Sequence, residues 1–247
     1  MKVLILAAGE GFPPGALVAE PPPLVEIGGI PVIMHLLTYY SHYNLNEFVL
    51  AIGEGYKEVG AWFLDREPLG KVISGGETIL EPTNPGWTLN LINSSSRSSG
   101  SVVKELTRSL CQDTFLLTSV NFLSDVNLGH MVRYHRSHGK TGTLTSVRPP
   151  SRFGHLKLHG NAVVSFEEKP RIRDQWINGG LYILNPGVAD YIEEGERLER
   201  EPLERLIDDG QLMAYQHEHF WHRITTSHDR ELLEELWQSG SAPWIAW

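Results

Sequence analysis

Residues 1–31 read MKVLILAAGEGFPPGALVAEPPPLVEIGGIP. Within this stretch, residues 3–6 form a short run of aliphatic side chains, which Gly9 and Gly11 follow closely. This pattern is typical of a buried strand that runs into a glycine-containing loop. Because glycine has no Cβ, the backbone of such a loop can approach a phosphate or a flat base closely. Gly9 and Gly11 are therefore candidate ligand-binding residues.

Strand and helix patterns alternate through the next part of the chain. Residues 32–43 carry apolar side chains at helical spacing, and residues 48–52 form a second apolar run typical of a buried strand. A helix is predicted through residues 62–64, and residues 115–118 are predicted to form a central strand. This βαβ order implies parallel strands joined by crossover helices. Ligands bind at the carboxyl ends of such strands, so residues 119–127 are expected at that edge.

The remaining patterns complete an α/β fold. Further helices are predicted over residues 102–110, 128–138, 188–194, 201–210 and 228–240, and further strands over residues 87–92, 141–147, 181–184 and 212–217. Residues 155–166 are typical of a β-hairpin that turns at Gly160-Asn161. Residues 69–85 show no clear period, and the serine-rich residues 93–101 are predicted to form a mobile loop. Because no repeat or long linker is visible, residues 1–247 are predicted to form one domain.

The composition limits the classes of partner and compartment. The formal net charge is -9, which argues against a nucleic-acid polymer because such a partner needs a basic face. No apolar run is long enough to span a bilayer, and no leader pattern opens the chain. The single cysteine, Cys111, excludes a disulfide framework and is expected to be a buried small hydrophobe. A cytoplasmic protein that binds a small molecule fits these limits.

Several motifs together resemble one enzyme family. They are the opening Ala-Ala-Gly-x-Gly and Leu-Val-Glu-Ile-Gly-Gly-x-Pro patterns, Ser151-Arg152-Phe153-Gly154, Phe166-Glu167-Glu168-Lys169-Pro170, Ile177-Asn178-Gly179-Gly180, Glu201-Pro202-Leu203 and Phe220-Trp221. Their order and spacing resemble the sugar-1-phosphate nucleotidyltransferases, and most closely the glucose-1-phosphate cytidylyltransferases, over nearly the whole chain. The resemblance implies a three-layer αβα, Rossmann-like and GT-A-like fold with a mixed sheet and a small β-hairpin lobe. It also implies a homo-oligomer.

The resemblance further implies a set of substrate-binding residues. In the family, the residue matching Glu168 bonds sugar hydroxyls, and the residue matching Lys169 meets the phosphate. Asn178 and Gly179 match a turn that admits the sugar ring against bare backbone. Arg152 and Gly154 belong to a further matching motif, in which the glycine allows close approach. Each feature also has a simpler interpretation, namely a solvated ion pair or an ordinary turn, but their order favours a retained sugar-phosphate pocket.

Other positions depart from the pattern of the family. Pro13 stands where the family usually has an arginine that contacts the triphosphate, and Glu20 and Pro22 replace lysines. Two carboxylates that hold Mg²⁺ in the family match Asn121 and Thr225, which supply only neutral oxygens. We therefore expect no metal and no cofactor, because a polyphosphate is poorly stabilised where cations are missing.

These departures lead to three competing hypotheses. The preferred one is a pseudoenzyme that has lost magnesium-dependent nucleotidyl transfer and keeps a sugar-phosphate-like pocket, either repurposed for metal-free chemistry or for binding only. The first alternative is an active glucose-1-phosphate cytidylyltransferase with displaced catalytic groups. The second is a non-catalytic structural or regulatory partner of an active paralogue.

The sequence assigns no catalytic residue, but two side chains are candidates. His222 lies beside the position of the lost carboxylate, where an imidazole can act as a general acid or base. Asp125 follows the central strand, although capping of the next helix is its simpler role. His217, His219 and His222 lie close together along the chain, but no cysteine or carboxylate with ligand spacing joins them, so a metal site is not predicted.

Overall fold

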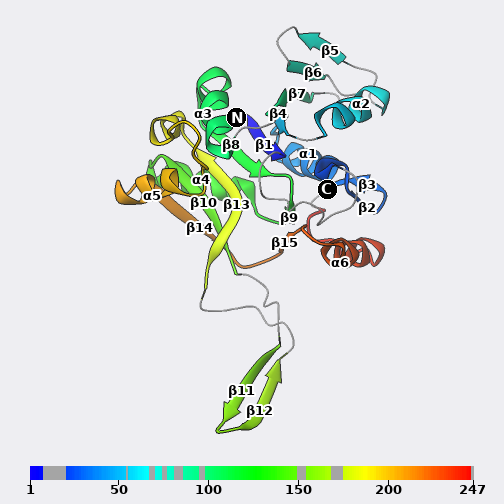
Figure 1. The fold of residues 1–247 in the computed structure, drawn as a ribbon, viewed down its shortest axis with the longest axis vertical. Helices are drawn as coiled ribbons and strands as arrows, with labels where there is room; N and C mark the ends of the chain where they lie inside the picture. Colours follow the sequence, from blue (N-terminus) through cyan, green and yellow to red (C-terminus); the bar gives the residue numbers. More distant parts are fainter. Residues whose placement is uncertain are drawn as a thin grey trace.

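A mixed β-sheet lies at the centre of the protein (Figure 1). The computed structural model describes residues 1–7, 21–53, 55–66, 70–73, 77–80, 86–94, 98–148, 154–167 and 175–245. Within these residues the sheet has nine strands, in the order β14 (Leu212–His217), β10 (Gly142–Val147), β13 (Ile177–Leu184), β8 (Phe115–Ser119), β1 (Val3–Ala7), β4 (Glu47–Ile52), β7 (Thr88–Asn93), β6 (Glu77–Leu80) and β5 (Gly70–Ile73).

This sheet contains both parallel and antiparallel strand pairs. β1 pairs in parallel with β4 and with β8, and β4 pairs in parallel with β7, which confirms the βαβ prediction for the first half. β13 is antiparallel to both of its neighbours, β8 and β10. The register between β10 and β13 shifts between Leu144 and Ser146, so the pairing is irregular there. Such irregularities re-aim backbone and side chains, and this one lies next to the pocket described below.

Helices cover both faces of the sheet and produce three layers. Because successive strand residues point to opposite faces, Val3 and Ile5 of β1 pack into one core and Leu4 and Leu6 into the other. The first core is covered by α1 (Val32–His42), α2 (Tyr56–Arg66), α4 (Leu128–His138) and α6 (Ser227–Gln238). The second is covered by α3 (Ser99–Leu110), α5 (Glu201–Asp208) and the 3-10 segment η2 (Pro186–Tyr191). The predicted three-layer αβα architecture is confirmed.

Short elements complete the fold. β9 (Phe122–Ser124) pairs with β15 (Trp221–Arg223), and β2 (Glu26–Ile27) pairs with β3 (Ile30–Pro31) next to η1 (Pro22–Leu24). β11 (His155–His159) and β12 (Ala162–Glu167) form the predicted hairpin, which stands apart from the sheet at the bottom of Figure 1. Every residue of these two strands is exposed. The predicted lobe is therefore a two-stranded hairpin in which every strand residue is exposed.

Three predictions about elements differ from the structure. Strands β5 and β6 occupy part of the region in which no period was recognised. Helix α3 begins at Ser99, three residues before the predicted start, because the Ser98 side chain caps its first turn by accepting a hydrogen bond from the Ser101 amide. The α-helix predicted over residues 188–194 is absent from these described residues, and the tighter η2 at Pro186–Tyr191 overlaps its first part.

Two predictions that were drawn from the composition can also be compared with the structure. Cys111 is buried, as expected, and burial raises the pKa of its thiol to about 11. In the part of the chain that the structure describes, none of the helices has the length and apolarity needed to cross a membrane.

Candidate functional site

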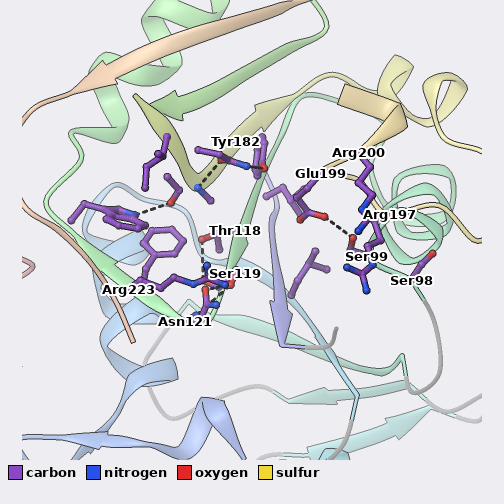
Figure 2. Close-up of a pocket in the computed structure, with 18 of the residues that line it drawn as sticks. Ser98, Ser99, Thr118, Ser119, Asn121, Tyr182, Arg197, Glu199, Arg200 and Arg223 are labelled. Atoms are coloured by element: carbon purple, nitrogen blue, oxygen red, sulfur yellow. Dashed lines mark hydrogen bonds between the residues drawn. The ribbon is translucent and has the colours of Figure 1, made fainter. Parts of the chain in front are cut away.

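A pocket of about 600 Å³ opens at the carboxyl ends of β1 and β8 (Figure 2). Leu6 of β1 and Leu117 and Thr118 of β8 line its base. Ser119 and Asn121, which follow at the end of β8, line it as well. The expectation that a ligand-binding edge follows the central strand is thus consistent with the geometry, because parallel strands present their carboxyl ends at one side of a sheet.

One side of the pocket, the strand half, is built by β8, β9, β13 and β15. Its residues are Ser119, Asn121, Phe122, Ile177, Asn178, Gly179, Gly180, Tyr182, Trp221 and Arg223. The other side, the loop half, is built by the start of α3 and by the segment between η2 and α5. Its residues are Ser98, Ser99, Gly195, Arg197, Glu199 and Arg200. Figure 2 shows the labelled members of the two halves on opposite sides of the pocket.

Two glycines of β13 shape the strand half. A Cβ on Gly179 would lie 3.0 Å from the Thr145 carbonyl oxygen, so only glycine lets β13 approach the irregular part of β10 this closely. Gly180 has a φ of +77°, and a Cβ there would lie 3.1 Å from the Phe122 ring. These residues were interpreted as a turn, but they belong to a strand whose backbone lines the pocket.

Asn178 is held in place by two hydrogen bonds. Its Oδ1 accepts from the Gly180 amide at 2.9 Å, and its Nδ2 donates to the Tyr182 hydroxyl. Burial raises the pKa of the Tyr182 phenol above its ordinary value, and the charge of Glu199 adds to this effect. Tyr182 therefore stays neutral and fixes the Asn178 amide at the pocket wall.

Strand β15 sends alternate side chains in opposite directions. The Trp221 indole Nε1 donates to the Gly179 carbonyl at 2.8 Å, which joins β15 to β13. Arg223, two residues further on, lines the same pocket, as the period of two in a strand requires. His222 lies between them in sequence, and its Nε2 is 3.2 Å from Asp229 Oδ1 on α6. His222 is not among the residues that line the pocket.

Asn121 joins the end of β8 to Arg223. When the amide is oriented so that its nitrogen donates to Ser119 Oγ, its oxygen accepts from Arg223 Nε at 3.3 Å and from Nη2 at 3.2 Å. This orientation matches donors with acceptors, whereas the reverse orientation places like groups together. The amide side chain is buried. Asn121, an uncharged residue, thus orients the Arg223 guanidinium.

The loop half depends on serine hydroxyls. Ser99 Oγ donates to Glu199 Oε2 at 2.9 Å and accepts from the Leu198 amide at 3.1 Å. Ser101 Oγ accepts from the Gly195 amide at 3.0 Å. The serine-rich residues predicted to form a mobile loop therefore include the cap and first turn of α3, which hold the 195–200 segment.

A second set of contacts fixes the same segment from its other side. Arg205 of α5 donates to both carboxylate oxygens of Glu196, with 3.0 Å between Nη1 and Oε1, and also to the Tyr191 carbonyl. This pairing lowers the pKa of the Glu196 carboxyl below its ordinary value. Gly100 allows the close approach, because a Cβ there would lie 2.5 Å from the Glu196 carbonyl oxygen. Arg197 and Arg200 are thereby presented to the pocket.

The pocket is locally cationic although the chain is acidic. Among the described residues that line it, Arg197, Arg200 and Arg223 carry positive charge and only Glu199 carries negative charge. The formal net charge of the whole chain is -9. Guanidinium groups recognise phosphate through several N–H donors at once. The arrangement is suited to an anionic ligand of the size of a nucleotide or sugar phosphate.

Comparison with known proteins identifies the family. The nucleotidyl transferase family profile matches residues 2–238. The chain belongs to the sugar-1-phosphate nucleotidyltransferase family. It is 35% identical to the glucose-1-phosphate cytidylyltransferase of Salmonella typhimurium, over an alignment of 258 positions that spans 100% of both chains. It is 32% identical to the probable glucose-1-phosphate cytidylyltransferase of Bacillus subtilis, again over 100% of both chains.

A solved structure shares the fold of this chain. The crystal structure of HddC from Yersinia pseudotuberculosis superposes with a TM-score of 0.72, covering 96% of this chain and 99% of that one. The sequence identity of the pair is 18%, so this likeness concerns the fold alone.

The preferred hypothesis from the sequence is overturned by these relatives. Proteins that match the chain from end to end are named as glucose-1-phosphate cytidylyltransferases, which favours an active enzyme over a pseudoenzyme or a repurposed fold. That hypothesis rested on cations counted only in the first part of the chain and on the replaced carboxylates at Asn121 and Thr225. Arg197, Arg200 and Arg223 come from distant segments that the fold brings to one pocket. No local motif signals them, so sequence reasoning missed all three.

The predicted substrate-binding residues fall into three groups. Asn178 and Gly179 line the pocket. Gly154 lies directly before β11 and is not among the lining residues. Gly9, Gly11, Arg152, Glu168 and Lys169 lie outside the described residues.

The two candidate catalytic residues make contacts away from the pocket. Asp125 Oδ1 accepts from the Phe220 amide at 2.8 Å and lies 3.0 Å from His217 Nε2. It therefore holds the turn before β15, while Asn127 rather than Asp125 caps α4. His222 is paired with Asp229, as described above. These contacts explain both residues as structural supports of β15.

The described residues do not supply the donor set that Mg²⁺ requires. Asn121 and Thr225 offer neutral oxygens, and the Asn121 oxygen already accepts from the Arg223 guanidinium, whose charge repels a cation. Thr225 Oγ1 donates to Asp229. Within the described ranges no group of three His, Cys, Asp or Glu side chains is arranged to hold a metal ion. No step of the reaction is therefore derived through a metal.

Proposed function

We propose that this protein is a glucose-1-phosphate cytidylyltransferase. It would join CTP to glucose 1-phosphate, forming CDP-glucose and releasing pyrophosphate. The observation that carries the proposal is 35% identity to a protein of that name over the full length of both chains. The cationic pocket adds independent support, because both substrates are phosphate anions.

The reaction needs positioning and charge neutralisation more than covalent chemistry. A phosphate oxygen of the sugar phosphate attacks the α-phosphorus of CTP, and the bond from that phosphorus to the β-phosphate oxygen breaks, so that pyrophosphate leaves. Arginine side chains stabilise the charge that spreads over the phosphate oxygens. We assign this role to the arginines of the pocket, while Asn178 and the bare backbone of Gly179 would hold the sugar ring. Gly9, Gly11, Arg152, Gly154, Glu168 and Lys169 stay predicted substrate contacts.

A pyrophosphate-release assay tests the proposal. The full-length protein is incubated with glucose 1-phosphate, CTP and Mg²⁺, and the product is identified by mass spectrometry as CDP-glucose. ATP, GTP and UTP, and mannose 1-phosphate, serve as competing substrates. We expect the CTP and glucose 1-phosphate pair to give the highest kcat/KM. An absence of pyrophosphate release with every pair would refute the proposed activity.

We further propose that the enzyme is a homo-oligomer in which the β11–β12 hairpin packs against another copy. Leu156, Leu158, Val163, Val164 and Phe166 of the hairpin are each 55–62% exposed. A two-stranded hairpin that buries no side chains is marginal in water, so contact with a second copy would supply the missing burial. Light scattering should show a smaller assembly for Phe166→Ser, but not for Ile207→Ser, which removes an equally exposed apolar residue from α5. A wild-type monomer would contradict the proposal.

We also propose that the chain works in the cytoplasm as one domain. Its single cysteine is buried and reduced in the structure, and no disulfide is needed for the fold. Cooperative unfolding in one urea transition, unchanged by a reducing agent, is expected. Two separated transitions would argue against a single domain.

A further inference from the structure

Strand β13 contains a bulge where it passes the pocket. Between the pair Leu144–Tyr182 and the pair Ser146–Asn178, β13 has three residues where β10 has one. Residues 179–181 therefore form the β13 bulge, and the first two of them line the pocket. Because a bulge re-aims the backbone of its strand, the pocket wall assigned to the sugar depends on how the two ends of this bulge are held.

The two ends of the β13 bulge are held by ladders of different length. Beyond Tyr182, β13 is paired with β10 as far as Leu184 and is also paired with β8 on its other side. On the side before the bulge, the ladder in the described part of the chain has two pairs, which Asn178 and Ile177 form with β10. Such a short ladder opens easily by itself, because few backbone hydrogen bonds must break. Asn178 therefore needs support from outside the ladder.

Three side chains meet one step beyond this short ladder. Arg148 directly follows β10, Trp176 directly precedes β13, and Glu218 directly follows β14. The registers of these neighbouring strands place the three residues in one row across the sheet, where side chains of adjacent strands can meet. Arg148 Cζ lies over the Trp176 ring, 4.2 Å from its centre. The Nε and Nη2 atoms of the same guanidinium donate to Glu218 Oε1 at 3.4 Å.

The contact with the indole is the stronger of the two. The Arg148 side chain is 23% exposed, whereas that of Glu218 is 63% exposed. An ion pair with an exposed partner contributes little, because water screens the charges. A guanidinium over an indole gains more, because tryptophan attracts cations most strongly among the aromatic residues and Trp176 is itself half-buried. Trp176 is thus the main partner of Arg148, and their contact joins the ends of β10 and β13.

We propose that Arg148 is a positioning residue of the enzyme. Its contact with Trp176 closes the short ladder before the β13 bulge, and so keeps Asn178 and the Gly179 backbone at the pocket wall. Arg148, Trp176 and Glu218 are not among the residues that line the pocket, so the effect on the ligand is indirect. This inference rests on the proposed function for the identity of that ligand, glucose 1-phosphate. The loop half is built by other segments and does not depend on this contact.

Hydrogen exchange of the full-length protein without ligand tests the support of the ladder. In Arg148→Gln, residues 176–178 should exchange about 5- to 30-fold faster than in the wild type, the range expected for the loss of one cation–π contact. Residues 182–184, beyond the bulge, should not change. Arg148→Lys should exchange more slowly than Arg148→Gln, because an ammonium group is also attracted to the indole. Arg108→Gln is the control, because Arg108 is exposed on α3 and pairs with Asp190.

Steady-state kinetics with Mg²⁺ present test the effect on the reaction. Arg148→Gln should raise the KM for glucose 1-phosphate by about 5- to 30-fold and change the KM for CTP by less than about twofold. Trp176→Leu should have the same effect, whereas Trp176→Phe, which keeps an aromatic ring, should retain most of the wild-type affinity. Glu218→Gln should have a smaller effect than either, because its ion pair is exposed. Equal KM values for glucose 1-phosphate in Arg148→Gln and Arg108→Gln overturn the proposal.

The double variant separates an indirect role from a direct contact with the ligand. If Arg148 acts through Trp176, Arg148→Gln combined with Trp176→Leu raises the KM for glucose 1-phosphate no further than Trp176→Leu alone. If Arg148 binds the ligand itself, the double variant loses more than Trp176→Leu, and the proposal is overturned. Circular dichroism checks that each variant is folded. If Trp176→Leu is not folded, Arg148→Gln, Arg148→Lys and Trp176→Phe decide the matter.

The outcomes also distinguish this inference from the proposed function. Pyrophosphate release with an unchanged KM for glucose 1-phosphate in Arg148→Gln refutes the positioning role and leaves the activity standing. If the wild-type protein releases no pyrophosphate, the proposed activity is refuted, and calorimetric titration with glucose 1-phosphate decides the role of Arg148. Weaker binding by Arg148→Gln than by the wild type supports that role. Equal binding by the two proteins, or no binding by the wild type, refutes it.

Discussion

The two halves of the pocket are built by different means. In the strand half, Trp221 and Arg223 are positioned by the alternation of β15 and by one indole-to-carbonyl bond to β13. In the loop half, Arg197 and Arg200 are positioned by serine hydroxyls of α3 and by the pairing of Arg205 with Glu196. One half relies on backbone pairing and the other on side-chain hydrogen bonds.

This difference predicts different tolerance to substitution. A strand in a ladder keeps its direction when one side chain changes, because the backbone hydrogen bonds remain. A segment held by individual hydroxyls moves when one of them is lost, because each bond contributes about 1 kcal/mol. The close approaches at Gly100 and Gly179 are the points at which each half can be disturbed most directly.

The largest effect is expected for Gly100→Ala in the loop half. The new Cβ would lie 2.5 Å from the Glu196 carbonyl oxygen, and because backbone must move, we expect a loss of about 1–3 kcal/mol in the free energy of unfolding. Gly60→Ala on α2 is the matched control. Its Cβ meets no atom within 4 Å, so that change should stabilise by about 0.5–1 kcal/mol. Urea denaturation measures both. A Gly100→Ala variant as stable as Gly60→Ala would contradict the tight contact.

A smaller effect is expected for Gly179→Ala in the strand half. The new Cβ would lie 3.0 Å from the Thr145 carbonyl oxygen and from Val147 Cγ1, so β10 must shift by a few tenths of an ångström, at a cost of about 1 kcal/mol. Calorimetry should also show weaker binding of glucose 1-phosphate. Gly187→Ala, whose Cβ would meet no atom within 4 Å, should change neither quantity. If Gly179→Ala binds glucose 1-phosphate as tightly as the wild type does, the backbone of Gly179 does not hold the sugar as proposed.

Ser98→Ala tests the helix cap that supports the loop half. The Ser98 hydroxyl accepts from the Ser101 amide at 3.2 Å, and its loss should destabilise the protein by about 1 kcal/mol. Asn127→Ala removes the corresponding cap of α4, where Oδ1 accepts from the His130 amide at 2.9 Å. Both variants should lose similar stability, but only Ser98→Ala should weaken binding of pyrophosphate. Equal binding in the two variants would show that α3 does not support the pocket.

The smallest effect near neutral pH is expected from two histidines of α4 that are hydrogen-bonded to Thr143 of β10. The Lys140 amide donates to His138 Nδ1, so His138 Nε2 donates to Thr143 Oγ1, and that hydroxyl donates to His135 Nδ1. Protonation of either ring breaks this chain of bonds. Burial lowers the pKa of both His135 and His138 below the ordinary value of 6.5.

The sign of the pH dependence follows from these lowered pKa values. The stabilisation is fully present above about pH 6.5 and is lost as the pH falls through the lower pKa of the folded state. The free energy of unfolding should therefore decrease on acidification from about pH 7.5 to about pH 5. Hydrogen exchange should increase in β10 before it increases in α3. His138→Gln should reduce the change of the free energy of unfolding with pH. If that change stays the same, the hydrogen bonds of His135 and His138 are not its cause.

Much of the fold was predictable because its signals are local. Helix α4 was predicted over residues 128–138, and the structure has it at Leu128–His138, because Asn127 caps its start and Gly139, with a φ of +64°, ends it. The hairpin turn at Gly160 was equally clear. In contrast, β9 and β15 have three residues each, too few to show a period, and they exist because they pair with each other.

The sequence by itself determined the order of strands and helices, the Rossmann-like class and the family, since apolar periodicity, caps and motif spacing are properties of neighbouring residues. Only the tertiary structure decided the charge of the pocket. Arg223 faces the pocket because β15 pairs with β9, and Arg197 is presented because Gly100 admits the Glu196 backbone. The physical reason is that electrostatic interactions depend on distance in space, whereas the sequence records only separation along the chain.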